Sequence, residues 1–436
     1  MRRVREAHVA AGPAETNPGS AILGHALLRT AAGAGSVLVG LTLAAAPPAA
    51  HPHAALASLS GWLGGAAYGA ELAASLPLGV AADVIAPAAL MVGGAVLSAL
   101  ALLLFALAAT LPLWFFSRVL AGAAAAGVTP PLLAVLARSH YGAARRARLM
   151  SLFELSMLAG LSVGPVLAAQ LWSHTARAAF GWSALLCLPA ALLLYLGVRR
   201  ARLTGESRPH SGVYALYAAA LAGLRQALRD PSLRRLAPAW LCFNSIVGLW
   251  LAPTVTYLLS APDPKHLQYL DGLFAQRPMA LTWLFAGYAM TFAAGLGGWA
   301  IVLGRIGAAR TLRIALVAML AVSAVLFALN RCQSCQLGTR TALVVLAALL
   351  VMIESGFTPA ALSWLSASVA AQRAAGAAMG IYSVLFSVGG ALGALLAGAL
   401  ARADGMDGLL YGTAALVTLA WLSLPPMRQP MLEAPV

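Results

Sequence analysis

The chain has 436 residues, of which 61% are hydrophobic and only 9% are charged, and its mean hydropathy is +0.84. Soluble domains carry roughly 25% charged residues, so this composition excludes a soluble globular protein and indicates an all-α protein that crosses a membrane many times. The formal net charge of +15 does not indicate a nucleic-acid-binding protein, because the arginines flank apolar segments instead of forming one patch.

Twelve apolar segments follow one another, each long enough to cross a hydrocarbon core of about 30 Å as a helix. In chain order they are 22–46, 55–80, 88–109, 112–136, 149–172, 179–199, 236–259, 279–303, 311–329, 342–366, 375–401 and 407–425. A longer, arginine-rich connection divides them into two groups of six. The predicted organisation is therefore a tail at 1–21, a six-helix bundle at 22–199, a linker at 200–235, a second six-helix bundle at 236–425 and a tail at 426–436.

The basic residues lie mainly on one side of this arrangement. Most arginines fall in the tails and connections that share a side with both termini, such as Arg145 and Arg146 after the fourth segment. Because loops rich in Arg and Lys stay in the cytoplasm, we predict that both termini and the linker are cytoplasmic. The expected location is a bacterial-type plasma (inner) membrane, with the lipid bilayer as the surrounding partner.

The two groups of six segments contain a sequence repeat. Residues 127–133 read GVTPPLL, and residues 356–362 read GFTPAAL. At the same spacing along the chain, Gly160 pairs with Gly389 and Gly164 pairs with Gly393. Two halves with the same order of helices are typical of transporters built from parallel repeats.

This pattern resembles the major facilitator superfamily over essentially the whole chain. Three of its signatures have counterparts here: the loop after the second segment, an arginine followed by small residues in the fourth, and G-x3-G-P in the fifth. The loop signature matches at Gly79 and Asp83, with Arg305 in the equivalent loop of the second half. The arginine signature matches at Arg118 and Gly122, and the G-x3-G-P signature matches at Gly160, Gly164 and Pro165. The first loop lacks the arginines that are usual in the family, so the charge interactions of this cytoplasmic loop in the family are in question for this chain.

The resemblance implies two six-helix bundles related by pseudo-two-fold symmetry, which alternate around a central site. Its G-x3-G-P signature is associated with antiporters and exporters, so the family suggests a drug/proton-antiporter-like protein. Gly160, Gly164 and Pro165, with Gly389 and Gly393, form smooth, bent helix faces that suit a gate. The alternative is tight helix packing without a gating role.

Charged residues within the segments are costly, about 2.5–3.5 kcal/mol each at a helix centre. There are five: Arg29, Glu71, Arg118, Glu154 and Glu354. Glu354 lies near the middle of the tenth segment, which lines the central cavity in the resembling family. It is the first candidate for binding a substrate or a proton, unless a buried basic group holds it permanently.

Three further charges lie at one depth and predict a cluster. Arg29, Glu71 and Glu154 are each about 8–14 Å from the cytoplasmic face, so two carboxylates could compete for one arginine, or all three could form a static salt bridge. His25, one turn before Arg29, either joins this cluster or, as is commoner, lies near the membrane interface.

Two more residues on the expected cavity helices are candidates. Arg118 matches an arginine that the resembling family associates with proton coupling in antiporters, and structural pairing is the alternative. Asn244, in the seventh segment, is the best candidate among the uncharged polar side chains for contacting a substrate.

No motif for soluble chemistry is found. The sequence lacks a phosphate-binding G-x4-G-K-[ST] loop and credible metal-ligand spacing, so we expect no cofactor, no metal and no enzyme activity. Cys332 and Cys335 form a C-x-x-C in a predicted outer loop, where a local disulfide is one reading.

The predicted function is secondary active transport of a small molecule by a monomer, with proton-coupled efflux favoured and protons as the coupling ion. Proton-coupled import of a small polar solute and a non-transporting membrane scaffold or sensor are the alternatives, and a membrane-embedded enzyme is a weaker one.

Overall fold

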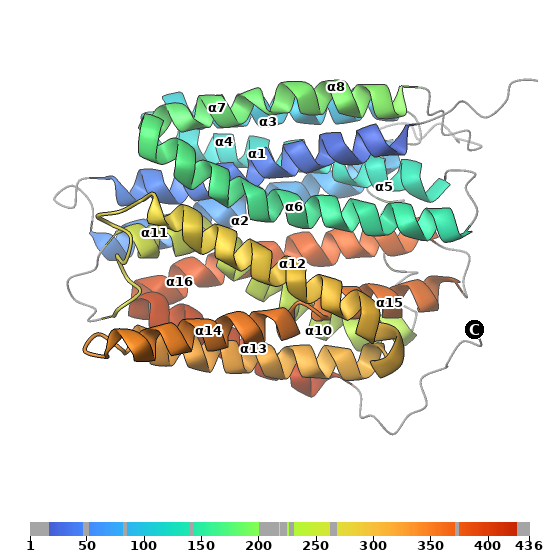
Figure 1. The fold of residues 1–436 in the computed structure, drawn as a ribbon. Helices are drawn as coiled ribbons and strands as arrows, with labels where there is room; N and C mark the ends of the chain where they lie inside the picture. Colours follow the sequence, from blue (N-terminus) through green and yellow to red (C-terminus); the bar gives the residue numbers. More distant parts are fainter. Residues whose placement is uncertain are drawn as a thin grey trace, which may run out of the picture.

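The computed structural model describes residues 17–46, 52–81, 85–138, 143–199, 218, 225, 231–261, 268–370 and 375–424, apart from some side chains within helices. The linker 200–235 and both predicted tails therefore lie largely outside the described residues. The described part is helical throughout, as the composition predicts, and its helices run side by side in two groups (Figure 1).

The first group is the N-terminal half. It contains α1 (Pro18–Ala44), α2 (His53–Ala81), α3 (Pro87–Leu107), α4 (Leu111–Ala126), α5 (Thr129–Arg138), α6 (Ala143–Thr175), η1 (Ala176–Ala178), α7 (Ala179–Leu185) and α8 (Cys187–Val198). Helix α1 begins at Pro18, four residues before the predicted segment: the Asn17 side chain accepts a hydrogen bond from Ser20 N, and Pro18 occupies the first helical position.

The second group is the C-terminal half. It contains α10 (Pro231–Leu251), α11 (Pro253–Ser260), α12 (Ala280–Ile306), α13 (Ala308–Asn330), α14 (Leu337–Glu354), α15 (Phe357–Ala370) and α16 (Ala375–Ser423). Helix α16 holds the last two predicted segments, which are separated by the non-helical residues Asp404 and Gly405. Gly405 has φ +56, a backbone conformation that favours glycine.

Each of the twelve predicted segments lies on one helix or on two consecutive helices. Among the described residues, eight helical stretches are long and apolar enough to cross a membrane, and a ninth qualifies if α10 and α11 count as one bent span. Two of the eight, Leu155–Val198 and Val384–Ser423, each contain two predicted segments.

The fourth and tenth segments were expected to be continuous helices, and the structure breaks both. Helix α4 ends at Ala126 before α5, and α14 ends at Glu354 before α15. Proline has no N–H with which to bond the carbonyl four residues earlier, and Pro130 and Pro359 occupy the same place in the repeated G-x-T-P motif. The repeat therefore places a helix break at equivalent positions in the two halves.

The seventh segment is also broken. Ala252 is extended, with φ −63 and ψ 151, and separates α10 from α11, which together are bent by 40°. The residue before a proline disfavours the helical conformation, and Pro253 follows directly.

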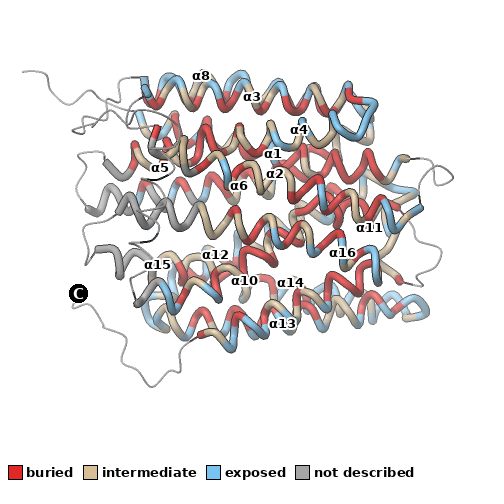
Figure 2. Tube along the Cα trace, turned by 180° about the vertical axis from the view of Figure 1, so that it is seen from behind, coloured by how far each residue is buried: buried red, intermediate tan, exposed pale blue. Residues whose placement is uncertain are grey.

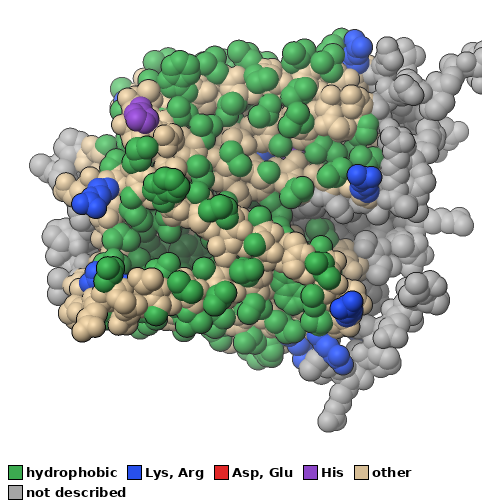
Figure 3. Space-filling model, in the orientation of Figure 1, with side chains coloured by type: hydrophobic (Ala, Val, Ile, Leu, Met, Phe, Trp, Pro, Cys, Tyr) green, Lys and Arg blue, Asp and Glu red, His purple; other side chains and the backbone are tan. Residues whose placement is uncertain are grey.

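Buried residues concentrate where the two halves meet (Figure 2). The larger hydrophobic cluster runs from the N-terminal half through α11 and into α16, and a smaller one lies within the C-terminal half. In Figure 3 hydrophobic side chains are spread over the visible face between the two ends, and arginines gather towards the ends. This banding fits a surface that contacts lipid.

The halves are in contact at the end predicted to face outward. Ser36 Oγ donates to the Leu251 carbonyl over 2.8 Å, and Ser60 Oγ donates to Thr254 Oγ1 over 2.9 Å. The Tyr257 hydroxyl donates to the His53 carbonyl over 3.1 Å. These bonds join α1 and α2 to the α10–α11 region, so the structure is closed at this end.

A disulfide joins Cys332 and Cys335 in the loop between α13 and α14. Arg340 Nε donates to the Cys332 carbonyl over 3.0 Å, which ties the loop to the start of α14. Cys187, which is buried, and Cys242, which is half-buried, are free and lie within helices.

This disulfide provides a test of the predicted orientation. We expect a membrane-impermeant maleimide to label intact cells only after treatment with an impermeant reductant, because both sulfurs are bonded and the loop is predicted to face outward. A Cys332→Ser/Cys335→Ser variant is the control and should stay unlabelled. Labelling without reductant would contradict the disulfide, and labelling only after cell lysis would contradict the orientation.

Candidate functional site

A buried ion pair lies inside the N-terminal half. Arg29 Nη2, on α1, is 3.3 Å from Glu71 Oε1, on α2, and both side chains are at least nine-tenths buried. Arg29 Nη2 also donates to Thr129 Oγ1, at the start of α5, over 2.7 Å. The structure thus brings together two of the three charges expected at this depth. The side chain of Glu154, the third, lies outside the described part.

Small residues explain why this pair can be buried. A methyl group added at Gly122 would lie 2.8 Å from Glu71 N and would also collide with the Ala67 carbonyl, so only glycine lets α4 approach α2 here. Gly122 belongs to the small-residue run after Arg118 that the sequence singles out. Close helix approach replaces the hydrophobic driving force that is missing in lipid.

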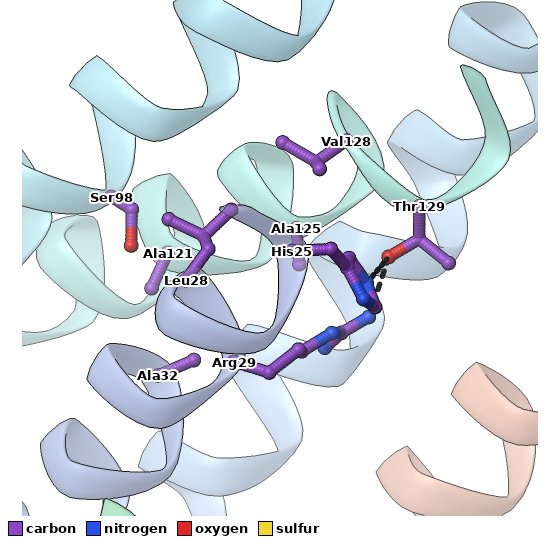
Figure 4. Close-up of a pocket in the computed structure, with 9 residues that line it drawn as sticks. All are labelled: His25, Leu28, Arg29, Ala32, Ser98, Ala121, Ala125, Val128 and Thr129. Atoms are coloured by element: carbon purple, nitrogen blue, oxygen red, sulfur yellow. Dashed lines mark hydrogen bonds between the residues drawn. The ribbon is translucent and has the colours of Figure 1, made fainter. Parts of the chain in front are cut away.

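His25 belongs to the same cluster. Its side chain is fully buried, and its Nδ1 lies 2.7 Å from Ser156 Oγ on α6. Figure 4 shows His25 and Arg29 pointing from α1 towards Thr129. Sequence reasoning did not select Thr129 or Ser156, although the repeated G-x-T-P motif marks the position of Thr129.

Arg118 has acceptors of its own. Its Nε donates to the Leu63 carbonyl on α2 over 3.3 Å. Tyr68, one turn further along α2, lies within electrostatic range of Arg118, Arg29 and Glu71. The Tyr68 ring is 6.0 Å from the Phe386 ring of α16, measured between centroids.

The packing of the repeated glycines makes Asn244 the structural counterpart of Arg29. A methyl group at Gly160 would collide with Arg29 Cβ, and a methyl group at Gly389 would collide with Asn244 Cβ. Equivalent glycines of α6 and α16 thus contact equivalent places on α1 and α10. Asn244 is 4% exposed, and its Nδ2 has no hydrogen-bond partner among the described residues, where the N-terminal half has a paired arginine.

Glu354 is the last residue of α14 and lies at the middle of the span formed by α14 and α15. It is half-buried, and within the described ranges no side chain or backbone group forms a hydrogen bond or ion pair with it. The Tyr288 hydroxyl, on α12, lies within electrostatic range. The repeat counterpart of Glu354 is Ala125, which lines a small cavity beside Arg29 and Thr129. The two halves therefore differ chemically at this point.

The paired glycines allow two close helix contacts. A methyl group at Gly164 would lie 2.5 Å from the Thr30 carbonyl on α1, and one at Gly393 would lie 2.6 Å from Leu249 N on α10. Both contacts lie within a half. The structure thus contains the tight packing that the sequence predicts for these residues and for Pro165 beside them, and their gating role stays a prediction.

The loop signatures are only partly described. Gly79 is half-buried near the end of α2, and Asp83 lies outside the described residues. In the second half, Arg305 is exposed near the end of α12, and Gly307 ends that helix with φ +84, which favours glycine. Within the part that the structure covers, no group of three or more His, Cys, Asp and Glu side chains could hold a metal ion.

Comparison with known proteins agrees with this architecture. A family model described as the Major Facilitator Superfamily matches residues 28–275. No curated protein matches the sequence. Two solved structures align with 94% of this chain. One is the human organic anion transporter MFSD10 (TETRAN), with a TM-score of 0.63, 17% sequence identity and 100% of its own chain covered. The other is a D-xylose-proton symporter, with a TM-score of 0.66, 14% sequence identity and 97% of its own chain covered. At these identities the likeness is one of fold.

Proposed function

Because the chain belongs to the Major Facilitator Superfamily, we propose that this transporter exports a small lipophilic or cationic compound in exchange for protons. The proposed substrate- and proton-binding group is Glu354, assisted by Asn244. Two halves of equivalent helices around a central site are the arrangement by which such transporters expose a site to each side in turn.

The observation that carries the proposal is the lack of a partner at Glu354. Among the described residues, Arg29 is paired with Glu71 and Arg118 donates to a carbonyl, whereas Glu354 forms no hydrogen bond or ion pair. An ionisable group in a membrane span needs a partner or water. A carboxyl group without one is suited to exchanging a proton for a bound cation.

The charge of the substrate follows from the same comparison. Arg29 already has a carboxylate partner in Glu71, and Arg118 donates from Nε to the Leu63 carbonyl. The group without a partner is acidic, which favours a cation. Tyr288 and Phe292 on α12 lie with ring centroids 5.8 Å apart, and aromatic rings attract cations and apolar groups. The outward direction is suggested by the G-x3-G-P signature of α6.

Proteoliposomes with a pH-sensitive dye test the proposal. A thermal-shift screen of drugs, sugars, amino acids and organic acids first selects compounds that stabilise the protein, because a ligand that binds only the folded state raises its melting temperature. Adding a selected compound outside the vesicles should acidify the medium, since antiport releases protons as the compound enters. Alkalinisation would indicate symport, and no pH change with any compound would indicate a scaffold.

A further inference from the structure

Five side chains of the N-terminal half form one hydrogen-bonded chain that the proposed exchange at Glu354 does not use. In order they are Glu71, Arg29, Thr129, His25 and Ser156. They come from α2, α1, α5, α1 and α6, so the chain connects four helices of this half. Its central member, His25, can exist in two neutral forms and one charged form, and the neighbours decide which form fits.

Ser156 fixes one nitrogen of His25. The Ser156 hydroxyl oxygen is 2.6 Å from the Phe153 carbonyl oxygen and 2.7 Å from His25 Nδ1. A carbonyl accepts hydrogen bonds and donates none, so the single hydroxyl proton of Ser156 goes to Phe153. Ser156 must then accept from His25, which places a proton on Nδ1.

Thr129 fixes the other nitrogen. Its hydroxyl oxygen accepts from Arg29 Nη2 over 2.7 Å and lies 3.5 Å from His25 Nε2. Among the described residues, Nε2 is the acceptor that the structure offers to the Thr129 proton, so Nε2 carries none. Both constraints select the same form of His25, a neutral imidazole with its proton on Nδ1.

Water has little access to this chain. His25 is 0% exposed, Ser156 4% and Thr129 5%. The cavity that His25, Arg29 and Thr129 line has a volume of about 10 Å³, which is at the lower limit for one water molecule. The His25 ring is stacked on Phe153, with centroids 4.7 Å apart. The protein groups around His25, and not bulk solvent, therefore fix its form.

Among the described residues, few charges lie near His25. Arg29 lies one helical turn along α1, and its described counter-charge is Glu71 on α2. The other helices around the cavity present hydroxyl groups, Ser98 from α3 and Thr129 from α5. A proton on Nε2 would turn the Thr129 hydroxyl away and place a second cation beside Arg29, with one described carboxylate to balance both.

We propose that His25 is a positioning residue of the N-terminal half. As the neutral form with its proton on Nδ1, it orients the Thr129 hydroxyl so that this group accepts from Arg29 and holds Arg29 against Glu71. A proton on His25 Nε2 and the intact Arg29–Glu71 arrangement then exclude each other. This inference concerns a different half from the proposed exchange at Glu354 and does not depend on it.

Nitrogen NMR of purified protein with ¹⁵N-labelled histidine tests the form directly. The chain has eight histidines, and the spectrum of His25→Phe, which keeps a ring against Phe153, identifies the His25 signals by their loss. We expect these signals to show a protonated Nδ1 and an unprotonated Nε2. In Ser156→Ala the proton should move to Nε2, because Nδ1 has lost its acceptor. A wild-type signal with the proton on Nε2, or with both nitrogens protonated, would overturn the proposal.

The pH profile of transport separates positioning from a purely structural role. His25→Phe and Thr129→Val should both shift the pH of half-maximal transport in the same direction, whereas His174→Gln, an exposed histidine at the other end of α6, should leave it unchanged. Equal profiles in all four proteins would contradict the inference. If wild type transports nothing, the proposed function fails, and the NMR result still decides the form of His25.

Discussion

Replacing Glu354 by glutamine is expected to abolish proton release from proteoliposomes while leaving the protein at least as stable as wild type. Glutamine has nearly the same shape but cannot exchange a proton, so any flux that remains should be uncoupled from pH. No described hydrogen bond or ion pair is lost. Removing an ionisable group from the middle of a span also removes a cost of about 2.5–3.5 kcal/mol on insertion scales.

The matched control for this variant is Asp404→Asn, which makes the same chemical change outside the spans. In the structure Asp404 contributes its backbone carbonyl to Gln268 Nε2 over 2.9 Å, and this bond survives the substitution. The control should keep both stability and proton release. Full proton coupling in Glu354→Gln would remove Glu354 from the mechanism, and a large loss of stability would show that its role is structural.

Unlike the replacement of Glu354, the loss of one member of the Arg29–Glu71 pair is expected to destabilise the protein. Arg29→Gln or Glu71→Gln alone should lower the free energy of unfolding by about 3–5 kcal/mol, because each leaves the other charge buried without its partner. In the double variant both charges are gone, so its loss should be much smaller than the sum of the two single losses. Thermal unfolding in detergent measures all three variants against wild type.

Arg402→Gln controls for the loss of an arginine, since Arg402 is exposed and surface substitutions usually change stability by less than about 0.5 kcal/mol. Single variants as stable as wild type would show that the pair is hydrated or dispensable. Additive losses in the double variant would show that the two charges stabilise the fold independently of each other.

Much of the architecture could be predicted from the sequence because the hydrocarbon core of a bilayer offers no water to pair with polar groups. Backbone groups in lipid must be paired within a helix, so long apolar segments already specify twelve helices. The cost of buried charge likewise singles out Arg29, Glu71, Arg118 and Glu354 from the sequence alone. The paired glycines indicate where helices approach closely, and the repeated G-x-T-P motif marks the two equivalent breaks, although these breaks themselves were not expected.

Only the tertiary structure decided which of these residues meet. Periodicity along one helix does not determine which face of another helix it contacts, and the decisive contacts join residues far apart in sequence: His25 and Ser156 are separated by 131 residues, and Arg29 and Thr129 by 100. Because the partners were not known from the sequence, Thr129 was not selected, and His25 was left with two readings, in the cluster or near the interface. Sequence determined where charge and small residues occur in the membrane, because lipid penalises every exception to an apolar helix. Packing determined which charges are neutralised and which is left without a partner, because pairing depends on distances of a few ångströms between side chains on different helices.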